Sequence, residues 1–203
     1  MKIASNEKIL LNDIKKIAIK GAEKRIAKHV ANATALLNIP TPDIYVIPYI
    51  ASHNDTLVFA EKKHPQLQID SLRKAGIEPL PAAFIPELNI IAITGYSIVL
   101  DQKYSDAVLL YSALHDLRMI WNYYNNPVDE PLDVPFCYDI SYYHAIDATA
   151  FARLYTDFVY RDKPYDYRAI IGAVFAMDDG ERYKRLEALK EEYGSRIEQL
   201  TNL

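Results

Sequence analysis

The sequence has a single cysteine, Cys137, so it can form neither a disulfide within the chain nor a thiolate cluster around zinc. Such low cysteine content is typical of a reducing compartment, and we expect a cytoplasmic protein. No apolar run approaches the roughly 18 residues that cross a membrane as a helix. The first residues become charged before any apolar stretch of signal-peptide length begins. We therefore expect no association with a membrane.

The sequence also has no large excess of charge of either sign. The 203 residues include 23 Lys and Arg against 27 Asp and Glu, a formal net charge of −4. Nucleic-acid-binding domains usually carry a basic face, and this balance gives none, so we expect no nucleic-acid partner. The six glycines are scattered along the chain and form no glycine-rich phosphate loop.

What the sequence does have is helical periodicity. Apolar residues recur every three to five positions across 6–37, where Gly21 predicts a kink or break, and helices are also expected over 104–124 and 142–160. A shorter apolar stretch, 167–177, is compatible with a buried helix. A last helix should start near Asp178 and present one apolar face, made of Leu186, Leu189, Tyr193, Ile197 and Leu200.

Strand signals are few and lie in the first half. Three β-branched or aromatic runs predict strands, namely Ile44–Ile50, with Pro48 marking an edge or a bulge, Asn89–Thr94 and Ser97–Leu100. These elements predict an α+β fold that is mainly helical, with a small sheet packed beside the helix 104–124.

The chain length suits one domain, or one domain with an extra helical arm. We expect a single domain over residues 1–177, including its N-terminal helical segment, and a C-terminal helix over 178–203. The apolar face of that helix has two possible uses. It can dock on its own domain, which is the commoner arrangement, or pair with a second copy as a short coiled coil and so form a homo-oligomer.

One helix carries a pattern with chemical meaning. Two histidines four positions apart on a helix can reach the same metal ion, and a glutamate beside the first can act as general base on a metal-bound water. In this sequence His115 occupies the first position. Asp116 stands in place of the glutamate, and Met119 stands in place of the second histidine.

Two short motifs, Leu114–Trp121 and Ala145–Ala152, resemble those of small zincin-like metallopeptidases of bacteria and phages with the ImmA/IrrE or SprT-like layout. In such proteins a glutamate on the later helix is the third zinc ligand, and Ala145 stands at that position here. The resemblance therefore implies a zincin-like scaffold that keeps one ligand, His115, and has lost two. Catalytic zinc needs three protein ligands, so we lean towards a protein that is not an enzyme.

The sequence leaves open a rebuilt metal site. His144 and Asp147 lie one turn apart and, with His115 and Asp116, would supply two imidazoles and two carboxylates for zinc. The favoured alternative is that the old site has become core, with Met119 filling the space and no cofactor bound.

Arg118 has two interpretations of its own. It is a candidate binding residue, but an ion pair with Asp116, with Asp147 or with a carboxylate from a loop is the default expectation for a helical arginine next to acidic positions.

Tyrosine is concentrated near the two motifs, since 11 of the 16 tyrosines lie between Tyr104 and Tyr167. Tyrosine offers a large rigid surface with a polar tip and is common at interfaces. We therefore expect a protein or peptide partner, with Tyr142 and Tyr143 in the contact, although simple helix packing explains the rings equally well. The function favoured is a catalytically inactive binding scaffold. The alternatives are an active metalloprotein or peptidase with a rearranged site, and a structural oligomer.

Overall fold

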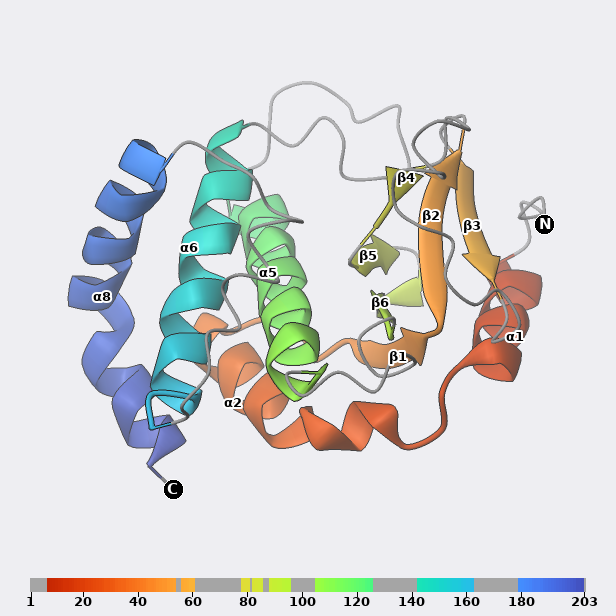
Figure 1. The fold of residues 1–203 in the computed structure, drawn as a ribbon, viewed down its shortest axis with the longest axis horizontal. Coiled ribbons are helices and arrows are strands. Elements are labelled where there is room, and N and C mark those ends of the chain that lie inside the picture. Colours follow the sequence, from red (N-terminus) through yellow and green to blue (C-terminus); the bar gives the residue numbers. More distant parts are fainter. Residues whose placement is uncertain are drawn as a thin grey trace.

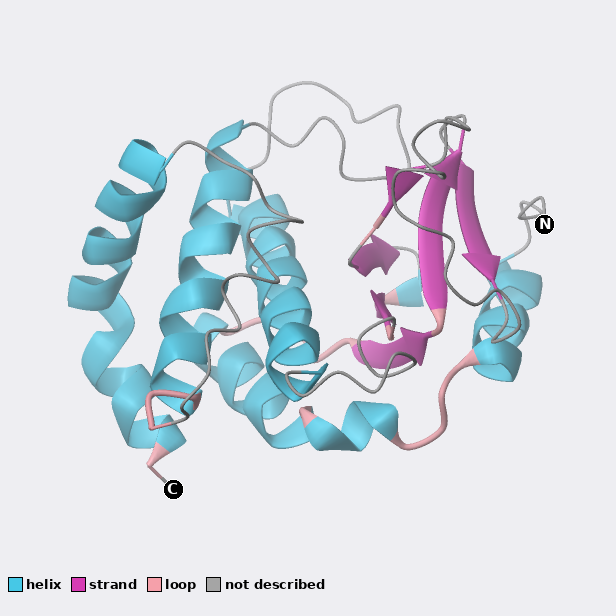
Figure 2. Ribbon diagram, viewed as in Figure 1, coloured by secondary structure: helices cyan, strands magenta, loops and turns pink. Residues whose placement is uncertain are grey.

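The computed structural model describes residues 7–53, 56–60, 78–80, 82–85, 88–95, 105–125, 142–162 and 179–202. The helices are α1 (Glu7–Ile17), the 3₁₀ turn η1 (Ala22–Arg25), α2 (Ala27–Leu37), α5 (Ser105–Asn125), α6 (Tyr142–Val159) and α8 (Asp179–Thr201). The strands are β1 (Asp43–Ile47), β2 (Tyr49–His53), β3 (Thr56–Ala60), β4 (Glu78–Pro79), β5 (Ala82–Ile85) and β6 (Ile90–Thr94). The expected α+β, mainly helical fold is confirmed (Figures 1 and 2).

The N-terminal helical stretch is broken where the sequence predicts it. Gly21 adopts a left-handed backbone conformation with φ of 80°, which glycine reaches without a steric penalty, and separates α1 from η1 and α2. At its other end α2 stops at Asn38, also left-handed with φ of 53°, two residues before Pro40.

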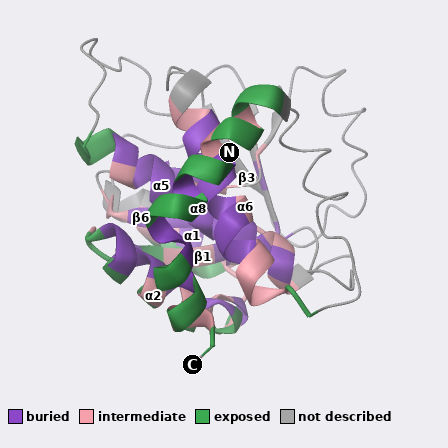
Figure 3. Ribbon diagram, turned by 90° about the vertical axis from the view of Figure 1, so that its left-hand side faces the viewer, coloured by how far each residue is buried: buried purple, intermediate pink, exposed green. Residues whose placement is uncertain are grey.

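The three long helices α5, α6 and α8 lie side by side as one layer (Figure 1). Helix α6 is in the middle, antiparallel to α5 and parallel to α8. Figure 3 shows α8 from the outside, with exposed residues alternating with buried ones along the helix. Its apolar residues Leu189, Tyr193 and Ile197 are buried in the core. The apolar face of α8 is therefore used within the chain.

In the described part of the chain, six strands form two three-stranded sheets. In the first, β6 is central, with β1 parallel to it on one side and β5 antiparallel on the other. In the second, β2 is central and pairs antiparallel with β3 and β4. Helix α5 packs on β5 and β6, as expected for the helix of His115. Buried residues of β6 and α5, Ile91, Ile93, Leu110 and Leu114 among them, share one hydrophobic core.

The strand predictions need correction. The run Ile44–Ile50 is not one strand, because the chain turns at Pro48 and continues into the second sheet as β2. Strand β6 confirms the prediction over Asn89–Thr94, but β3, β4 and β5 were missed. The run predicted at Ser97–Leu100 and the helix over 167–177 lie outside the described residues, as does Cys137. Among the helices that are described, each is too short or too polar to cross a membrane.

Candidate functional site

Between the three helices, near the start of α6, lies a group of charged and polar side chains that we call the ion cluster: the buried Arg118 and Asn122 of α5, Asp147 of α6 and the partly exposed Arg185 of α8. Arg118 is completely buried. Its Nε and Nη2 atoms donate to the two carboxylate oxygens of Asp147 at 2.5 and 3.2 Å. Such a two-pronged pair fixes the relative rotation of the two helices as well as their distance.

Asp147 has further donors on either side of that pair. Asn122 Nδ2 donates to its Oδ2 atom at 2.9 Å, and Arg185 Nε donates to Oδ1 at 2.6 Å. Each carboxylate oxygen thus accepts two hydrogen bonds, and the four bonds come from both neighbouring helices. A carboxylate saturated in this way is electrostatically satisfied without a metal ion.

Aromatic rings surround the Arg118 guanidinium. Its central carbon lies 3.8 Å from the centre of the Trp121 ring, 5.4 Å from that of Phe151 and 5.5 Å from that of Tyr193. Its Nη1 atom also donates to the Tyr193 hydroxyl at 3.4 Å. Cation–π attraction and stacking suit arginine, whose planar charge is weakly hydrated, better than lysine. The rings compensate for part of the hydration that Arg118 loses on burial.

The charges of the ion cluster stabilise one another. Burial by itself raises the pKa of the Asp147 carboxyl, but the hydrogen bonds and charge of Arg118, with Asn122 and Arg185, outweigh it and hold that pKa below its ordinary value. Burial likewise opposes the charged form of Arg118, and Asp147 reverses the effect, so the pKa of Arg118 is raised. Both groups are charged at neutral pH.

His115 and Asp116 lie three and two positions before Arg118 on α5, outside the ion cluster. His115 Nδ1 is 3.1 Å from Asp116 Oδ1. The second carboxylate oxygen of Asp116, Oδ2, is buried and has no hydrogen-bond partner within the described part of the chain. The contact with Asp116 orients the His115 imidazole. Catalytic zinc needs three protein ligands, and this imidazole would supply one of them.

Among the described residues of the two motifs, the ligand set of a catalytic zinc ion is incomplete. Met119, at the place of the second histidine, is buried with 6% of its surface exposed, and its thioether is a poor zinc ligand. Ala145 has no ligand atom, and Asp147 is saturated by arginine and asparagine. Among the described residues, no three His, Cys, Asp or Glu side chains are grouped so that they could hold a metal ion. His115, Asp116, His144 and Asp147 are thus not gathered into the rebuilt site considered from the sequence.

The other predicted site residues have mixed outcomes. The carboxylate that pairs with Arg118 is Asp147, one of the three considered from the sequence. Since its guanidinium is buried, Arg118 is not on a surface where a partner could contact it. Tyr142 and Tyr143 begin α6, but their side chains lie outside what the structure describes.

Arg185 and Asn122 were missed as members of the ion cluster. Arg185 is 38 positions away from Asp147 in the sequence, and only the packing of α8 on α6 brings it close. The available signal for Asn122 was its place one turn after Arg118 on the same face of α5.

Neither a protein-family model, nor a curated protein, nor a solved structure matches this chain.

Exposed tyrosines lie at one end of the three-helix layer. Because α5 is antiparallel to α6 and α8, the end of α5 and the beginnings of α6 and α8 lie together at the top of Figure 1. Tyr123 and Tyr124 at the end of α5 are 48% and 55% exposed, and their ring centres are 5.3 Å apart. Tyr183, in the first turns of α8, is 61% exposed. We call this region the tyrosine end.

Proposed function

We propose that this protein is a catalytically inactive, zincin-like scaffold that binds a protein or peptide partner. The observation that carries the proposal is the state of Asp147, whose two carboxylate oxygens are already saturated by Arg118, Asn122 and Arg185. The helix pair that would hold zinc in the resembling peptidases is here joined by the ion cluster. The ion cluster stabilises the packing of α5, α6 and α8. In this proposal the partner binds to the surface of the protein and not at the old metal site.

The tyrosine end is the contact surface in this proposal. Exposed apolar surface that is grouped, unlike single scattered side chains, often marks an interaction site, and tyrosine is enriched among the residues that dominate binding energy. Tyr123 and Tyr124 are neighbours on a rigid helix, so they lose little conformational freedom when a partner covers them. Tyr142 and Tyr143 start the adjacent helix and extend the same end of the layer.

Removing the two exposed rings of α5 is expected to weaken partner binding at least tenfold, which corresponds to about 1.4 kcal/mol. The ligands are peptides selected on the wild-type protein from a library displayed on phage and fused through the peptide C-terminus. Their dissociation constants are measured by calorimetry for wild type and for the double variant Tyr123→Ala, Tyr124→Ala. The control is Tyr123→Phe, Tyr124→Phe, which keeps both rings and should keep most of the affinity.

The same assay covers the start of α6, where Tyr142→Ala or Tyr143→Ala should also weaken binding without changing the helical circular dichroism signal. Selected peptides that bind every variant as tightly as wild type would remove the tyrosine end from the proposal. Peptides that are cleaved during incubation would instead favour the alternative of an active peptidase.

A further inference from the structure

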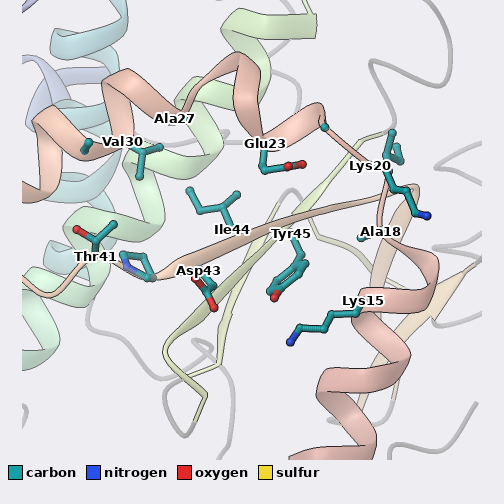
Figure 4. Close-up of a pocket in the computed structure, with 14 residues that line it drawn as sticks. Lys15, Ala18, Lys20, Glu23, Ala27, Val30, Thr41, Asp43, Ile44 and Tyr45 are labelled. Carbon is teal, nitrogen blue, oxygen red and sulfur yellow. The ribbon is translucent and has the colours of Figure 1, made fainter.

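A second surface, far from the ion cluster, has the properties of a ligand site. A pocket of about 490 Å³ opens between α1, the turn after it, α2 and strand β1 (Figure 4). This volume is within the range of small-ligand and peptide sites, roughly 300–1,000 Å³. Its walls are mostly apolar, with a few charged groups at their rim: Lys15, Lys20, Glu23 and Asp43.

One wall of the pocket is the outer edge of β1. This strand is at the edge of its sheet and pairs only with β6 among the described strands. The Asp43 N–H donates to Asn89 O at 3.0 Å, and Ile47 O accepts from Gly95 N–H at 2.5 Å, so these two residues direct their backbone groups towards β6. Backbone groups alternate along a strand, and those of Ile44 and Val46 therefore point away from the sheet.

Two residues of β1, Ile44 and Val46, direct their backbone groups to the outer edge, and they differ in whether that edge is already occupied. The carbonyl of Val46 accepts a hydrogen bond from Ile19 N–H at 2.8 Å, so the chain that follows α1 already occupies the edge there. At Ile44, by contrast, no backbone hydrogen bond on the outer side joins it to another described residue. An extended peptide can pair with Ile44, but it must end where Ile19 crosses the edge. The pocket thus fits the end of a chain and not a continuous strand.

The charges decide which end of a chain fits. Lys15 and Lys20 flank the closed side of the pocket, on the last turn of α1 and just after it, and Asp43 is at the open side where β1 begins. Figure 4 shows the ammonium end of Lys15 extending towards Tyr45 beside the strand. Within the described residues, neither lysine forms an ion pair with an acidic side chain. Glu23 also lines the pocket, so the two lysines outweigh one carboxylate, and the remaining positive charge favours a terminal carboxylate.

We propose that this pocket binds the free C-terminus of an extended peptide, which pairs in parallel with β1 through the N–H and C=O of Ile44. In that register the terminal carboxylate lies between Lys15 and Lys20, and Asp43 faces a basic side chain or amine two or three residues earlier. The pairing is strand addition to a sheet edge, a common mode of peptide recognition. The site is separate from the tyrosine end and does not depend on the function proposed there.

The test uses two degenerate pools of synthetic pentapeptides, one with free C-terminal carboxylates and one with C-terminal amides. Each pool is incubated with the full chain, and bound peptides are identified by mass spectrometry. The free-acid pool should be enriched and the amide pool should not. Dissociation constants of enriched peptides are then measured by calorimetry for wild type and variants.

The variant that tests the site is Lys15→Glu, Lys20→Glu, and its expected effect is a loss of affinity of at least tenfold. The matched control is Lys16→Glu, Lys24→Glu, which changes the net charge by the same amount at lysines that do not line the pocket. If the first variant does not fold, Ala31→Phe narrows the pocket from an exposed position of α2 and should also abolish binding.

Several results would overturn the proposal. They are the absence of enrichment from the free-acid pool, equal enrichment from both pools, and equal losses in the two lysine variants. The variant Tyr123→Ala, Tyr124→Ala should bind the enriched pentapeptides as wild type does, and phage-displayed peptides lack a free C-terminus. The two proposals can therefore fail independently.

Discussion

Replacing Asp147 with alanine is expected to lower the free energy of unfolding by about 3–5 kcal/mol, the usual cost of leaving a buried charge without its partner. Arg118 is completely buried and would lose both of the carboxylate oxygens that hold it. The measurement is urea unfolding followed by circular dichroism. The control on the same helix is Asp157→Ala, because the pair of Asp157 with Arg153 is partly exposed and should contribute less than about 1 kcal/mol.

A second variant distinguishes the energetic cost of an unpaired buried charge from the cost of lost packing. Replacing Arg118 by methionine in the Asp147→Ala background removes the unpaired charge, so the double variant should be more stable than Asp147→Ala alone. If the double variant is instead less stable by the sum of two independent losses, the ion cluster does not have the energetic role assigned to it.

The effect of Asp147 should also depend on pH. Its folded pKa lies below the ordinary value of 3.8, so its stabilising contribution is present above that value and is lost as the pH falls through the lower folded pKa. The stability difference between wild type and Asp147→Ala should be constant near neutral pH and shrink below about pH 4. A difference that stays constant into acid would contradict the ionised state of this carboxyl.

Gly95→Ala is expected to be the second most damaging change, with a loss of about 1–3 kcal/mol in unfolding free energy. A Cβ atom at this position would lie 2.7 Å from Ile19 Cδ1 and 2.9 Å from Val46 Cγ1, both closer than such contacts allow. The backbone of Gly95 is fixed by its bond to Ile47 O, so the clash cannot be relieved by a simple shift of the chain.

A second glycine provides the control for that measurement. Gly194 is inside α8, and an added Cβ there would meet only Lys190 Cγ, at an ordinary 3.5 Å. Gly194→Ala should therefore stabilise the protein by up to about 1 kcal/mol through helix propensity. Equal effects of the two substitutions in thermal unfolding would show that the contact of Gly95 with Ile19 and Val46 is not tight.

The positions of the long helices could be predicted from the sequence because the signals of a helix are local. Apolar spacing gave α5, α6 and α8 to within a residue or two, and Gly21 marked the break near the N-terminus because few other residues adopt its backbone conformation easily. The strands were harder. β5 has only four residues, too few for a period of two to be recognised, and the run around Pro48 hid a change from one sheet to the other.

The ion cluster was predictable only in part. Asp116 and Arg118 are two positions apart on a helix and point in different directions, which disfavours that pair from the sequence alone. Choosing Asp147 over a carboxylate from a loop required the packing of α6 on α5, and the second arginine required the position of α8. Contacts between helices depend on how the helices are rotated against each other, and residue spacing within one helix does not give that rotation.

The most direct test of the account is the metal content of freshly purified protein, measured by mass spectrometry beside the variant His115→Ala. The account predicts far less than one metal ion per chain in both proteins, because Met119 and Ala145 supply no zinc ligand and Asp147 is saturated by its hydrogen bonds. Close to one zinc ion per chain in wild type, absent from His115→Ala, would contradict the inactive scaffold and favour a metalloprotein with a rearranged site.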